Sequence, residues 1–354
     1  MTGTPEPAHQ ASAAQQGQEE SGQYLYRDVI VVGASAGGVE ALERLVRGLP
    51  PELPASVFVV LHMLSTGTSM LHSILARAGS LPASAAVDGE RFERGHIYVS
   101  PPDHHLLIRG GRIRLSLGPR ENGHRPAIDP LFRSAARALG PRVVAVVLSG
   151  SLDDGAAGAR FVKERGGAAV VQEPSDAVYA AMPTNALAAT DVDRVVPVAD
   201  MADALCRLLE EPLDKELEEE AESIWSAADL EERGAGDPSG LTCPECGGAL
   251  WQRDEGRLVR FACRTGHAFS PESLIQEQSK SLETAMWSAL RSLEERADLF
   301  RRMARRGGGS RGTAHRLESR ARAVERHATV IREAMAKLAP AIDPDKQPET
   351  EPAA

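Results

Sequence analysis

The chain has 354 residues, of which 42% are hydrophobic and only 4% aromatic, a length and composition that suit about two domains with cores of alanine, valine and leucine. The net charge is −10, and four cysteines are too few for a disulfide framework in a chain of this length. No apolar run reaches the about 20 residues that a membrane helix needs, and no secretory signal is visible, so we expect a cytoplasmic protein without a membrane span.

Residues 1–26 are rich in glutamine, alanine, serine and glutamate without any period, which predicts a disordered leader. In 27–206, runs of valine and isoleucine alternate with amphipathic segments, which predicts the α/β class: a doubly wound, mostly parallel sheet covered on both faces. Near residues 97–117 two strand candidates follow each other without a helix between them, which predicts a hairpin at the sheet edge. The strand candidates are 28–34, 56–63, 96–101, 105–117, 143–150 and 168–174.

The second part of the chain divides into three segments and a tail. Residues 207–240 are predicted to be an acidic linker, and residues 241–270 a compact unit that contains three of the four cysteines. Residues 271–340 are predicted to be an α-helical hairpin, because hydrophobic residues recur every three or four positions on both sides of a glycine-rich loop. The proline- and glutamate-rich residues 341–354 are predicted to be a disordered tail.

A glycine-rich turn, GASAG, follows the first predicted strand and contains Ser35. Gly33, Gly37 and Gly38 lack the spacing of a dinucleotide-binding loop, and the lysine of a phosphate loop is missing. GASAG instead fits the G-x-S-x-G elbow, which exposes a serine hydroxyl at the end of a sheet. The helix that starts after Ser35 offers backbone N–H groups to an oxyanion. A tight strand–helix turn with an incidental serine is the alternative at this point.

A nucleophilic serine needs a base and an acid that orients the base. Ligands of open α/β sheets bind at the carboxyl ends of the strands. Two further predicted strands end near His62 and near the pair Asp153 and Asp154, so three strand ends offer a serine, a histidine and an aspartate. His104 and His105 lie in a loop where a role in the site is also open.

Six motifs occur in the order seen in the catalytic domain of CheB-type chemotaxis protein methylesterases, which 27–206 resembles without the usual receiver domain. The motifs are GASAGG, LHM, GHIYVSPPDHHLLI, RPAIDPLFRSAA, SGSLDDGAAGARFVKERGG and EPSDAVYAAMPTNAL. The resemblance implies hydrolysis of glutamate γ-methyl esters on chemoreceptor cytoplasmic helices with release of methanol, and in some members glutamine deamidation. It implies no catalytic cofactor. Methylated receptors are the implied partners, with other chemosensory proteins as further candidates.

The resemblance also assigns roles to residues. Ser35 matches the family's nucleophile, His62 its base and Asp154 its orienting acid, and His105 matches a loop histidine near the site. The positions that match the oxyanion turn are Ala36, Gly37, Gly38 and Ser151.

The chain departs from the family pattern in three places. Ala36 stands where many members have a hydroxyl residue, and Ser151 and Leu152 stand where many have a methionine. The backbone N–H of Ser151 can still serve the oxyanion. Because only 26 residues precede the resemblance, we expect no control by phosphorylation of a receiver domain in the same chain.

Three cysteines and a histidine flank a predicted β-hairpin between residues 241 and 270: Cys243, Cys246, Cys263 and His267. Two short knuckles with three thiolates and one imidazole match the ligands of a tetrahedral zinc ion. Four protein ligands leave no open position, so the prediction is one structural zinc. The alternative is a set of free thiols beside an unrelated histidine.

Between Arg291 and Lys337 the helical hairpin carries thirteen Lys or Arg against six Asp or Glu, which raises nucleic-acid binding as a rival function. Aromatic residues are nearly absent there, which argues against that function and favours solvated helix faces or docking onto acidic helices. A second rival is a non-catalytic chemosensory scaffold that binds partners through the zinc unit and the basic helices. The complete set of serine, histidine and aspartate favours the esterase.

Overall fold

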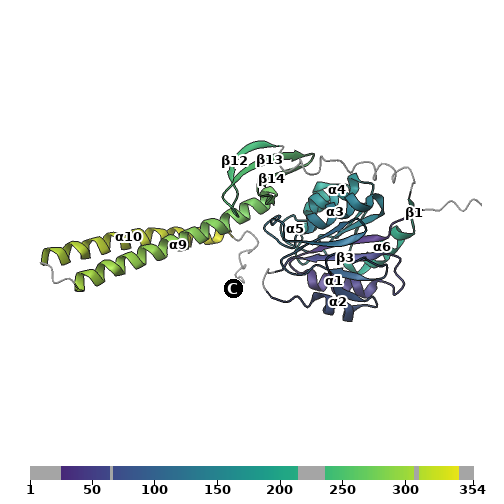
Figure 1. Cartoon of the computed structure of the whole chain (residues 1–354), viewed down its shortest axis with the longest axis horizontal. Coiled ribbons are helices and arrows are strands. Elements are labelled where there is room, and N and C mark those ends of the chain that lie inside the picture. The colour runs from purple at the N-terminus through teal and green to yellow at the C-terminus, as the bar shows by residue number, and fades with distance from the viewer. Residues whose placement is uncertain (1–24, 64–66, 214–235, 307–310, 343–354) are drawn as a thin grey trace, which may run out of the picture.

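The computed structural model describes residues 25–63, 67–213, 236–306 and 311–342. The predicted leader and tail lie almost entirely outside these ranges, as does most of the predicted acidic linker. Figure 1 shows an α/β domain, a small sheet beside it, and two long helices that project away from both. No helix within the described ranges is both long enough and apolar enough to cross a membrane.

Seven strands form one parallel sheet in the order β10-β9-β8-β2-β3-β5-β4. The α/β prediction is therefore confirmed, and this sheet is wholly rather than mostly parallel. Its four central strands consist mainly of valine and other small or branched apolar residues and are completely buried, as expected where helices cover both faces. The strands are β2 Val29–Ala34, β3 Ser56–Leu61, β4 Ala83–Ala85, β5 Ile97–Val99, β8 Val143–Val147, β9 Ala168–Gln172 and β10 Arg194–Val196.

Two hydrophobic cores lie on opposite faces of this sheet, because successive side chains of a strand point to opposite sides. Along β2, Ile30 and Val32 belong to one core, while Val29 and Val31 belong to the other. Figure 1 shows α1 and α2 on one side of the sheet and α3 and α4 on the other. The helices are α1 Gly38–Gly48, α2 Leu71–Ala78, α3 Ile128–Leu139, α4 Ala156–Glu164, α5 Ala181–Ala189 and α6 Val198–Glu210.

The hairpin predicted near 97–117 at the sheet edge is wrong, because β5 joins the parallel sheet between β3 and β4, and the second strand candidate, 105–117, is itself a hairpin. β6 His105–Arg109 and β7 Arg112–Ser116 pair with each other as a separate two-stranded sheet. Leu106, Ile108 and Ile113 are buried in the same core as α3, and the Ile108 N–H donates to the Ser134 hydroxyl of α3. The sequence predicts extended structure here, but the turn at Gly110–Gly111 divides the candidate into two strands, and their burial against α3 determines where the pair packs.

Two short strands close the α/β domain at the limits of its sequence. β1 Leu25–Tyr26 pairs antiparallel with β11 Pro212–Leu213, just outside the predicted bounds of 27 and 206. The Arg27 guanidinium adds hydrogen bonds to the Leu208 carbonyl and the Glu211 carboxylate. The two ends of the domain are therefore held next to each other by strand pairing and hydrogen bonds.

The remaining described residues, 236–306 and 311–342, are called the C-terminal unit below. They contain a four-stranded antiparallel sheet in the order β12-β13-β14-β15, followed by two long helices. Leu290 and Ala297 of the first helix and Ala321 and Ala328 of the second are buried. The elements are β12 Asp237–Thr242, β13 Ala249–Glu255, β14 Leu258–Cys263, β15 Ala268–Phe269, α9 Pro271–Arg306 and α10 Arg311–Ile342.

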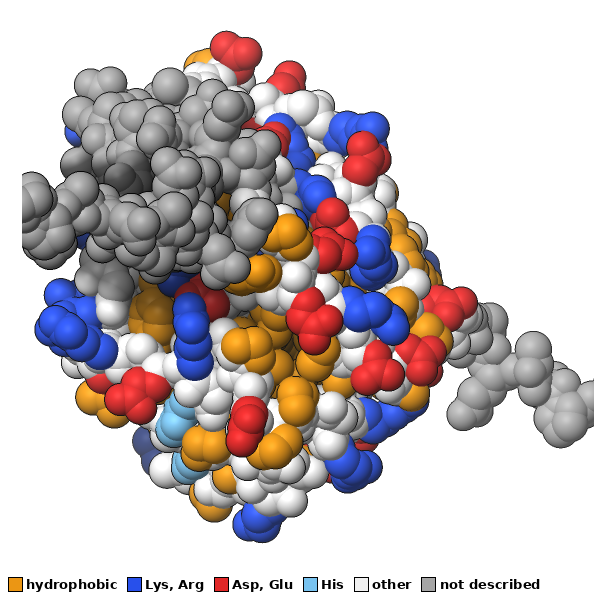
Figure 2. Space-filling model, turned by 90° about the vertical axis from the view of Figure 1, so that its right-hand side faces the viewer, with side chains coloured by type: hydrophobic (Ala, Val, Ile, Leu, Met, Phe, Trp, Pro, Cys, Tyr) orange, Lys and Arg blue, Asp and Glu red, His pale blue; other side chains and the backbone are white. Residues whose placement is uncertain are grey.

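Charges of both signs cover the face of the molecule that lies opposite the projecting helices. In Figure 2, the lysine and arginine side chains on this face alternate with aspartate and glutamate, and hydrophobic side chains lie between them. The part of this face that is drawn in colour therefore presents no continuous basic surface of the kind that binds nucleic acid.

Candidate functional site

The turn that carries Ser35 is held by close packing around two glycines. Gly37 has a left-handed φ of 68°, and a Cβ atom there would lie 2.8 Å from the Cβ of Val178. A Cβ atom at Gly150 would lie 2.8 Å from the Cβ of Ser35. The Ser35 N–H donates to the Ser149 carbonyl, which ties the turn to the loop after β8. The glycines thus let two strand ends meet at the serine.

Ser35, His62 and Asp154 lie in one hydrogen-bonded row at the carboxyl edge of the sheet. The Ser35 Oγ lies 3.1 Å from His62 Nδ1, and His62 Nε2 lies 2.7 Å from an Asp154 carboxylate oxygen. The order β8-β2-β3 explains the arrangement, because these neighbouring strands lead into the three residues. A carboxylate only accepts hydrogen bonds, so a neutral His62 carries its proton on Nε2 and accepts from the serine at Nδ1.

The Asp154 carboxylate is buried and accepts four hydrogen bonds. Besides His62, the donors are the backbone N–H groups of Ile128 and Asp129 and the side-chain amide of Asn122. Ile128 and Asp129 form the N-terminus of α3, where a negative charge is stabilised. Burial by itself raises the pKa of the Asp154 carboxyl, but the His62 hydrogen bond and charge and the Ile128 N–H hold it well below its usual range. Asp154 is therefore ionised at neutral pH.

His124 covers the imidazole of His62. The two rings are stacked with their centroids 3.7 Å apart and their planes 10° from parallel. Burial and the neighbouring His62 lower the pKa of His124 to about 3, so its ring is neutral. A neutral ring in this position restricts the orientation of His62 without adding charge to the site.

Three residues of this site were not predicted from the sequence: Asn122, His124 and Asp129. Asn122 and His124 lie in an irregular loop before α3, and only the acid at the start of a predicted helix hints at Asp129. Asp129 accepts hydrogen bonds from the N–H groups of Gly155 and Gly158. It therefore holds the backbone that directly follows Asp154.

His105 lies close to the site but not in the row. It is 4% exposed, its Nδ1 accepts from the Ala127 N–H, and its Nε2–H donates to the Pro119 carbonyl. Burial lowers the pKa of His105. With both ring nitrogens bonded to backbone, His105 braces the loop before α3.

The predicted oxyanion residues differ in how their N–H groups are used. The Gly38 N–H donates to the Ser35 carbonyl and closes the turn. Among the described residues, no acceptor is found for the N–H groups of Ala36 and Gly37, which precede α1, or for that of Ser151. Ser151 directly follows Gly150, where an added Cβ atom would lie 2.8 Å from the Cβ of Ser35.

The side chains of Cys243, Cys246, Cys263 and His267 converge in the C-terminal unit, with their ligand atoms all within 4.8 Å of one another. The Sγ atoms of Cys246 and Cys263 are 3.7 Å apart, and His267 Nδ1 lies 3.5 Å from the Cys263 Sγ. A zinc ion bound to thiolates at about 2.3 Å in a tetrahedron places neighbouring sulfurs about 3.8 Å apart. The donor set and its spacing therefore fit a metal ion.

Asp153 accepts a hydrogen bond of 2.7 Å from the Ser270 hydroxyl of the C-terminal unit rather than one from His62. Burial raises the pKa of the Asp153 carboxyl to about 7, against the effect of the Ser270 hydrogen bond, and Asp129 and Glu272 add to the rise. The folded chain therefore keeps a proton that the unfolded chain releases near pH 4, so ionisation of Asp153 costs stability between about pH 4 and 7.

The wild type loses stability as the pH rises because Asp153 ionises, and we expect Asp153→Asn to abolish this loss. The free energy of unfolding of the variant relative to the wild type should increase between pH 5 and pH 7 by at most about 1.4 kcal/mol per pH unit. Urea titrations at pH 5, 6, 7 and 8 measure it. Asp191→Asn, at a side chain that is 96% exposed, is the control and should follow the wild type. If the free energy of unfolding varied with pH in the same way for Asp153→Asn and the wild type, the raised pKa of Asp153 would be contradicted.

The fold and the site define a doubly wound α/β protein with a serine, a histidine and an aspartate in one row at the carboxyl edge of its sheet. A family profile described as CheB methylesterase matches residues 30–205. The crystal structure of the Thermotoga maritima CheB methylesterase catalytic domain is similar with a TM-score of 0.50 and 30% identity, over 52% of this chain and 100% of that one. The chain belongs to the CheB methylesterase family.

Relatives in several organisms show the same similarity. A Methanosarcina mazei protein named protein-glutamate methylesterase/protein-glutamine glutaminase 2 is 37% identical over 191 residues, which are 52% of this chain and 52% of that protein. A Leptospira interrogans protein, provisionally named a protein-glutamate methylesterase/protein-glutamine glutaminase, is 35% identical over 53% of this chain and 98% of its own length. The chain thus spans about half the length of the Methanosarcina relative and nearly all of the Leptospira one.

Proposed function

We propose that the chain is a serine hydrolase that removes methyl esters from glutamate side chains of methyl-accepting chemotaxis receptors. The observation that carries the proposal is the hydrogen-bonded row of Ser35, His62 and Asp154 at the carboxyl edge of the sheet. The names of the relatives, which join methylesterase and glutaminase activities, support the substrate class. Deamidation of receptor glutamines is proposed as a second reaction of the same site.

In the proposed reaction, the Ser35 oxygen attacks the carbonyl carbon of the methyl ester while its proton moves to His62 Nδ1. The ionised Asp154 stabilises the imidazolium that forms, through the hydrogen bond at Nε2. The tetrahedral intermediate collapses, the C–O bond to the methoxy group breaks, and His62 gives its proton to the departing methanol. Water then attacks the acyl-enzyme by the same steps, which frees Ser35 and leaves an unmodified glutamate side chain on the receptor.

The negative oxygen of the tetrahedral intermediate needs donors that are not already bonded. The N–H groups of Ala36 and Gly37 lie at the N-terminus of α1, where the helix dipole also favours negative charge. We assign these two groups to the oxyanion, with the Ser151 N–H as a third candidate donor. Gly38 contributes to the turn through its bond to the Ser35 carbonyl.

The experiment that tests the proposal measures methanol released from methylated receptor by the full chain. We expect release that depends on the protein and stops when the methylated glutamates are exhausted. Ammonia release from receptor glutamines is measured in parallel for the second reaction. Binding to receptor without release of either product would instead support the non-catalytic scaffold.

We also propose that Cys243, Cys246, Cys263 and His267 hold one structural zinc ion. The two knuckles are built alike: the Gly247 N–H donates to the Cys243 carbonyl, and the Gly266 N–H donates to the Cys263 carbonyl. Four protein ligands complete a tetrahedron, so the ion would fix the fold of the small sheet rather than bind substrate.

Metal analysis of the purified chain is expected to find one zinc per molecule, because the four ligands form a single site. Cys246→Ser should lower the zinc content and make the small sheet more sensitive to protease, since a metal that binds only the folded form stabilises it. Cys206→Ser, at the cysteine of α6 outside the cluster, is the control and should keep the zinc. A zinc-free chain with an intact C-terminal unit would contradict the proposal.

A further inference from the structure

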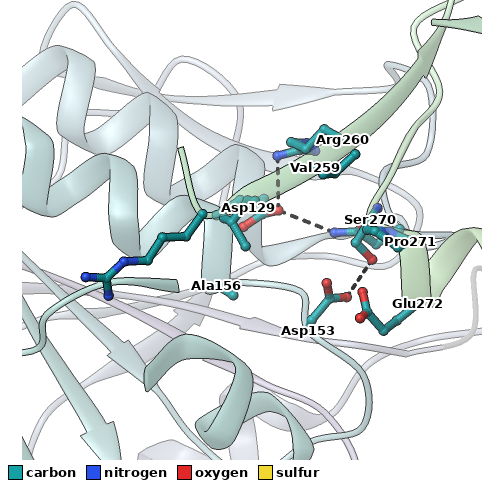
Figure 3. Close-up of a pocket in the computed structure, with 12 residues that line it drawn as sticks. Asp129, Asp153, Ala156, Val259, Arg260, Ser270, Pro271 and Glu272 are labelled. Atoms are coloured by element: carbon teal, nitrogen blue, oxygen red, sulfur yellow. Dashed lines mark hydrogen bonds and ion pairs between the residues drawn. The ribbon is translucent and has the colours of Figure 1, made fainter. Parts of the chain in front are cut away.

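The C-terminal unit contacts the α/β domain on the side of Asp154. Arg260 of β14 is largely buried and forms ion pairs with Glu121 at 3.0 Å and with Asp129 at 3.3 Å. The Ala268 carbonyl accepts from the Asn122 N–H at 2.7 Å, so the backbones also join. Figure 3 shows Arg260 and Ser270 pointing from the C-terminal unit toward Asp129 and Asp153. Next to these contacts lies a cavity of about 180 Å³.

The side-chain amide of Asn122 connects the two parts of the molecule. Its Nδ2 group donates to Asp154 at 3.0 Å and to Asp129 at 3.3 Å. Its oxygen accepts from the Ser270 N–H at 3.0 Å and from the Ser273 hydroxyl at 3.1 Å, both at the start of α9. Asn122 is 3% exposed, so these bonds are largely shielded from bulk water. One amide therefore joins the first turn of α9 directly to the proposed orienting acid.

Asp129 forms a second connection. One of its oxygens holds the N–H groups of Gly155 and Gly158, directly after Asp154, and the other faces Arg260. Burial and the nearby Asp154 raise the pKa of the Asp129 carboxyl to about 6, against the charges of Arg260 and Arg133. Removal of Arg260 leaves a buried carboxyl with less compensating charge, which favours its protonated form.

We propose that the C-terminal unit is a positioning part of the active site, in which Arg260 and the start of α9 hold Asn122 and Asp129, and through them Asp154. The proposal rests on the function proposed above. Asn122 donates to Asp154 and Asp129 holds the backbone after it, and both residues take hydrogen bonds or ion pairs from the C-terminal unit. None of these contacts reaches the serine.

The contacts of the C-terminal unit with Asn122 and Asp129 leave the Ser35 turn accessible, which agrees with a unit that supports the site rather than one that blocks it. Val178, whose Cβ lies beside Gly37 in the Ser35 turn, is 72% exposed, and the adjacent Tyr179 is 43% exposed. A receptor helix can therefore approach the turn from the side of Val178 while the C-terminal unit stays docked at Asp129 and Asn122.

Arg260→Met and Ser273→Ala in the full chain test the proposal. We expect kcat for methanol release to fall about 10- to 100-fold with little change in KM, because a displacement of about 1 Å at a catalytic group has an effect of this size. The decline of kcat toward acid pH should begin at a higher pH in Arg260→Met, since Asp129, which Asp154, Glu121, Arg133 and Arg260 surround, is protonated more easily. Arg260→Lys should restore part of kcat.

Arg257→Met is the matched control, because Arg257 lines the same cavity, is 65% exposed in its side chain and contacts only the exposed Asp191 at 3.7 Å among the described ion pairs. It should leave kcat within about twofold of the wild type, the range expected for a surface substitution. Circular dichroism identifies variants that fail to fold, and if Arg260→Met is one of them, Ser273→Ala and Arg260→Lys carry the test.

A second measurement does not depend on turnover. The proton between His62 Nε2 and Asp154 gives a low-field NMR resonance, which should shift or broaden in Arg260→Met and Ser273→Ala but not in Arg257→Met. An unchanged resonance with unchanged kcat overturns the proposal, and so does a rise in kcat, which identifies the unit as a restraint. If the wild type releases no methanol, the proposed function fails, and the NMR comparison still decides whether the C-terminal unit positions Asp154.

Discussion

Replacing Ser35 by alanine is expected to lower methanol release by a factor on the order of 10⁴ or more, because no other group can form the acyl-enzyme. His62→Ala is expected to cost a similar factor, since the serine then keeps its proton. The double variant should be no slower than either single variant, because the two residues act as one unit. Methanol release from methylated receptor, measured over hours with high protein concentration, checks all three.

Ser175→Ala is the matched control for this experiment. Ser175 lies in an exposed loop and hydrogen-bonds to Glu173, so its loss should leave turnover unchanged. Thermal unfolding of Ser35→Ala should match the wild type to within a few degrees, because Ser35 Oγ adds a single hydrogen bond to the fold. Turnover above a few percent of wild type in Ser35→Ala or His62→Ala would remove the assignment of that residue.

Asp154→Asn is expected to lower kcat by about 10⁴-fold, through the protonation state of His62. In the wild type, the Asp154 carboxylate accepts hydrogen bonds from four donors. The amide of the variant has a single acceptor oxygen, and its NH₂ group would face N–H donors. A proton on His62 Nε2 would oppose the amide N–H, so His62 carries its proton on Nδ1 instead. Nδ1 faces Ser35 and can then no longer accept the serine proton. Turnover at several pH values checks the effect.

Asp153→Asn provides the comparison for this variant, because the sequence offers two adjacent acids after the same strand. Its amide oxygen can still accept from the Ser270 hydroxyl, so turnover should fall far less than in Asp154→Asn. Equal losses in the two variants would show that the orienting role does not belong to Asp154 alone. The comparison thus separates a specific role from a general sensitivity of this loop.

The sequence predicts the parts of the site that lie directly after buried strands. The valine-rich runs that lead to Ser35 and His62 mark the ends of adjacent strands, so their approach follows from the parallel sheet. Which of Asp153 and Asp154 faces His62 depends on the turn that begins α4, and there the family resemblance, rather than the pattern, selects Asp154.

The residues that surround the row could not be predicted, because tertiary contacts place them. Asn122 and His124 belong to a loop without periodicity, and their positions depend on contacts with Ser270 before α9 and with His62. The hairpin β6–β7 shows the same limit: its apolar residues predict extended structure, but not that the two strands pair with each other apart from the main sheet. Arg260, more than a hundred residues after Asp129, has no local signal for its partner.

The pairing of β1 with β11 has a consequence for rearranging the gene. Because Leu25 and Leu213 are register partners, the first and last residues of the α/β domain lie within one strand spacing of each other. A short peptide can join them, and the sequence can be reopened at an exposed surface turn such as Gly110–Gly111. Such a circular permutant should fold with the same sheet, and the whole domain is suited to insertion into a loop of a host protein.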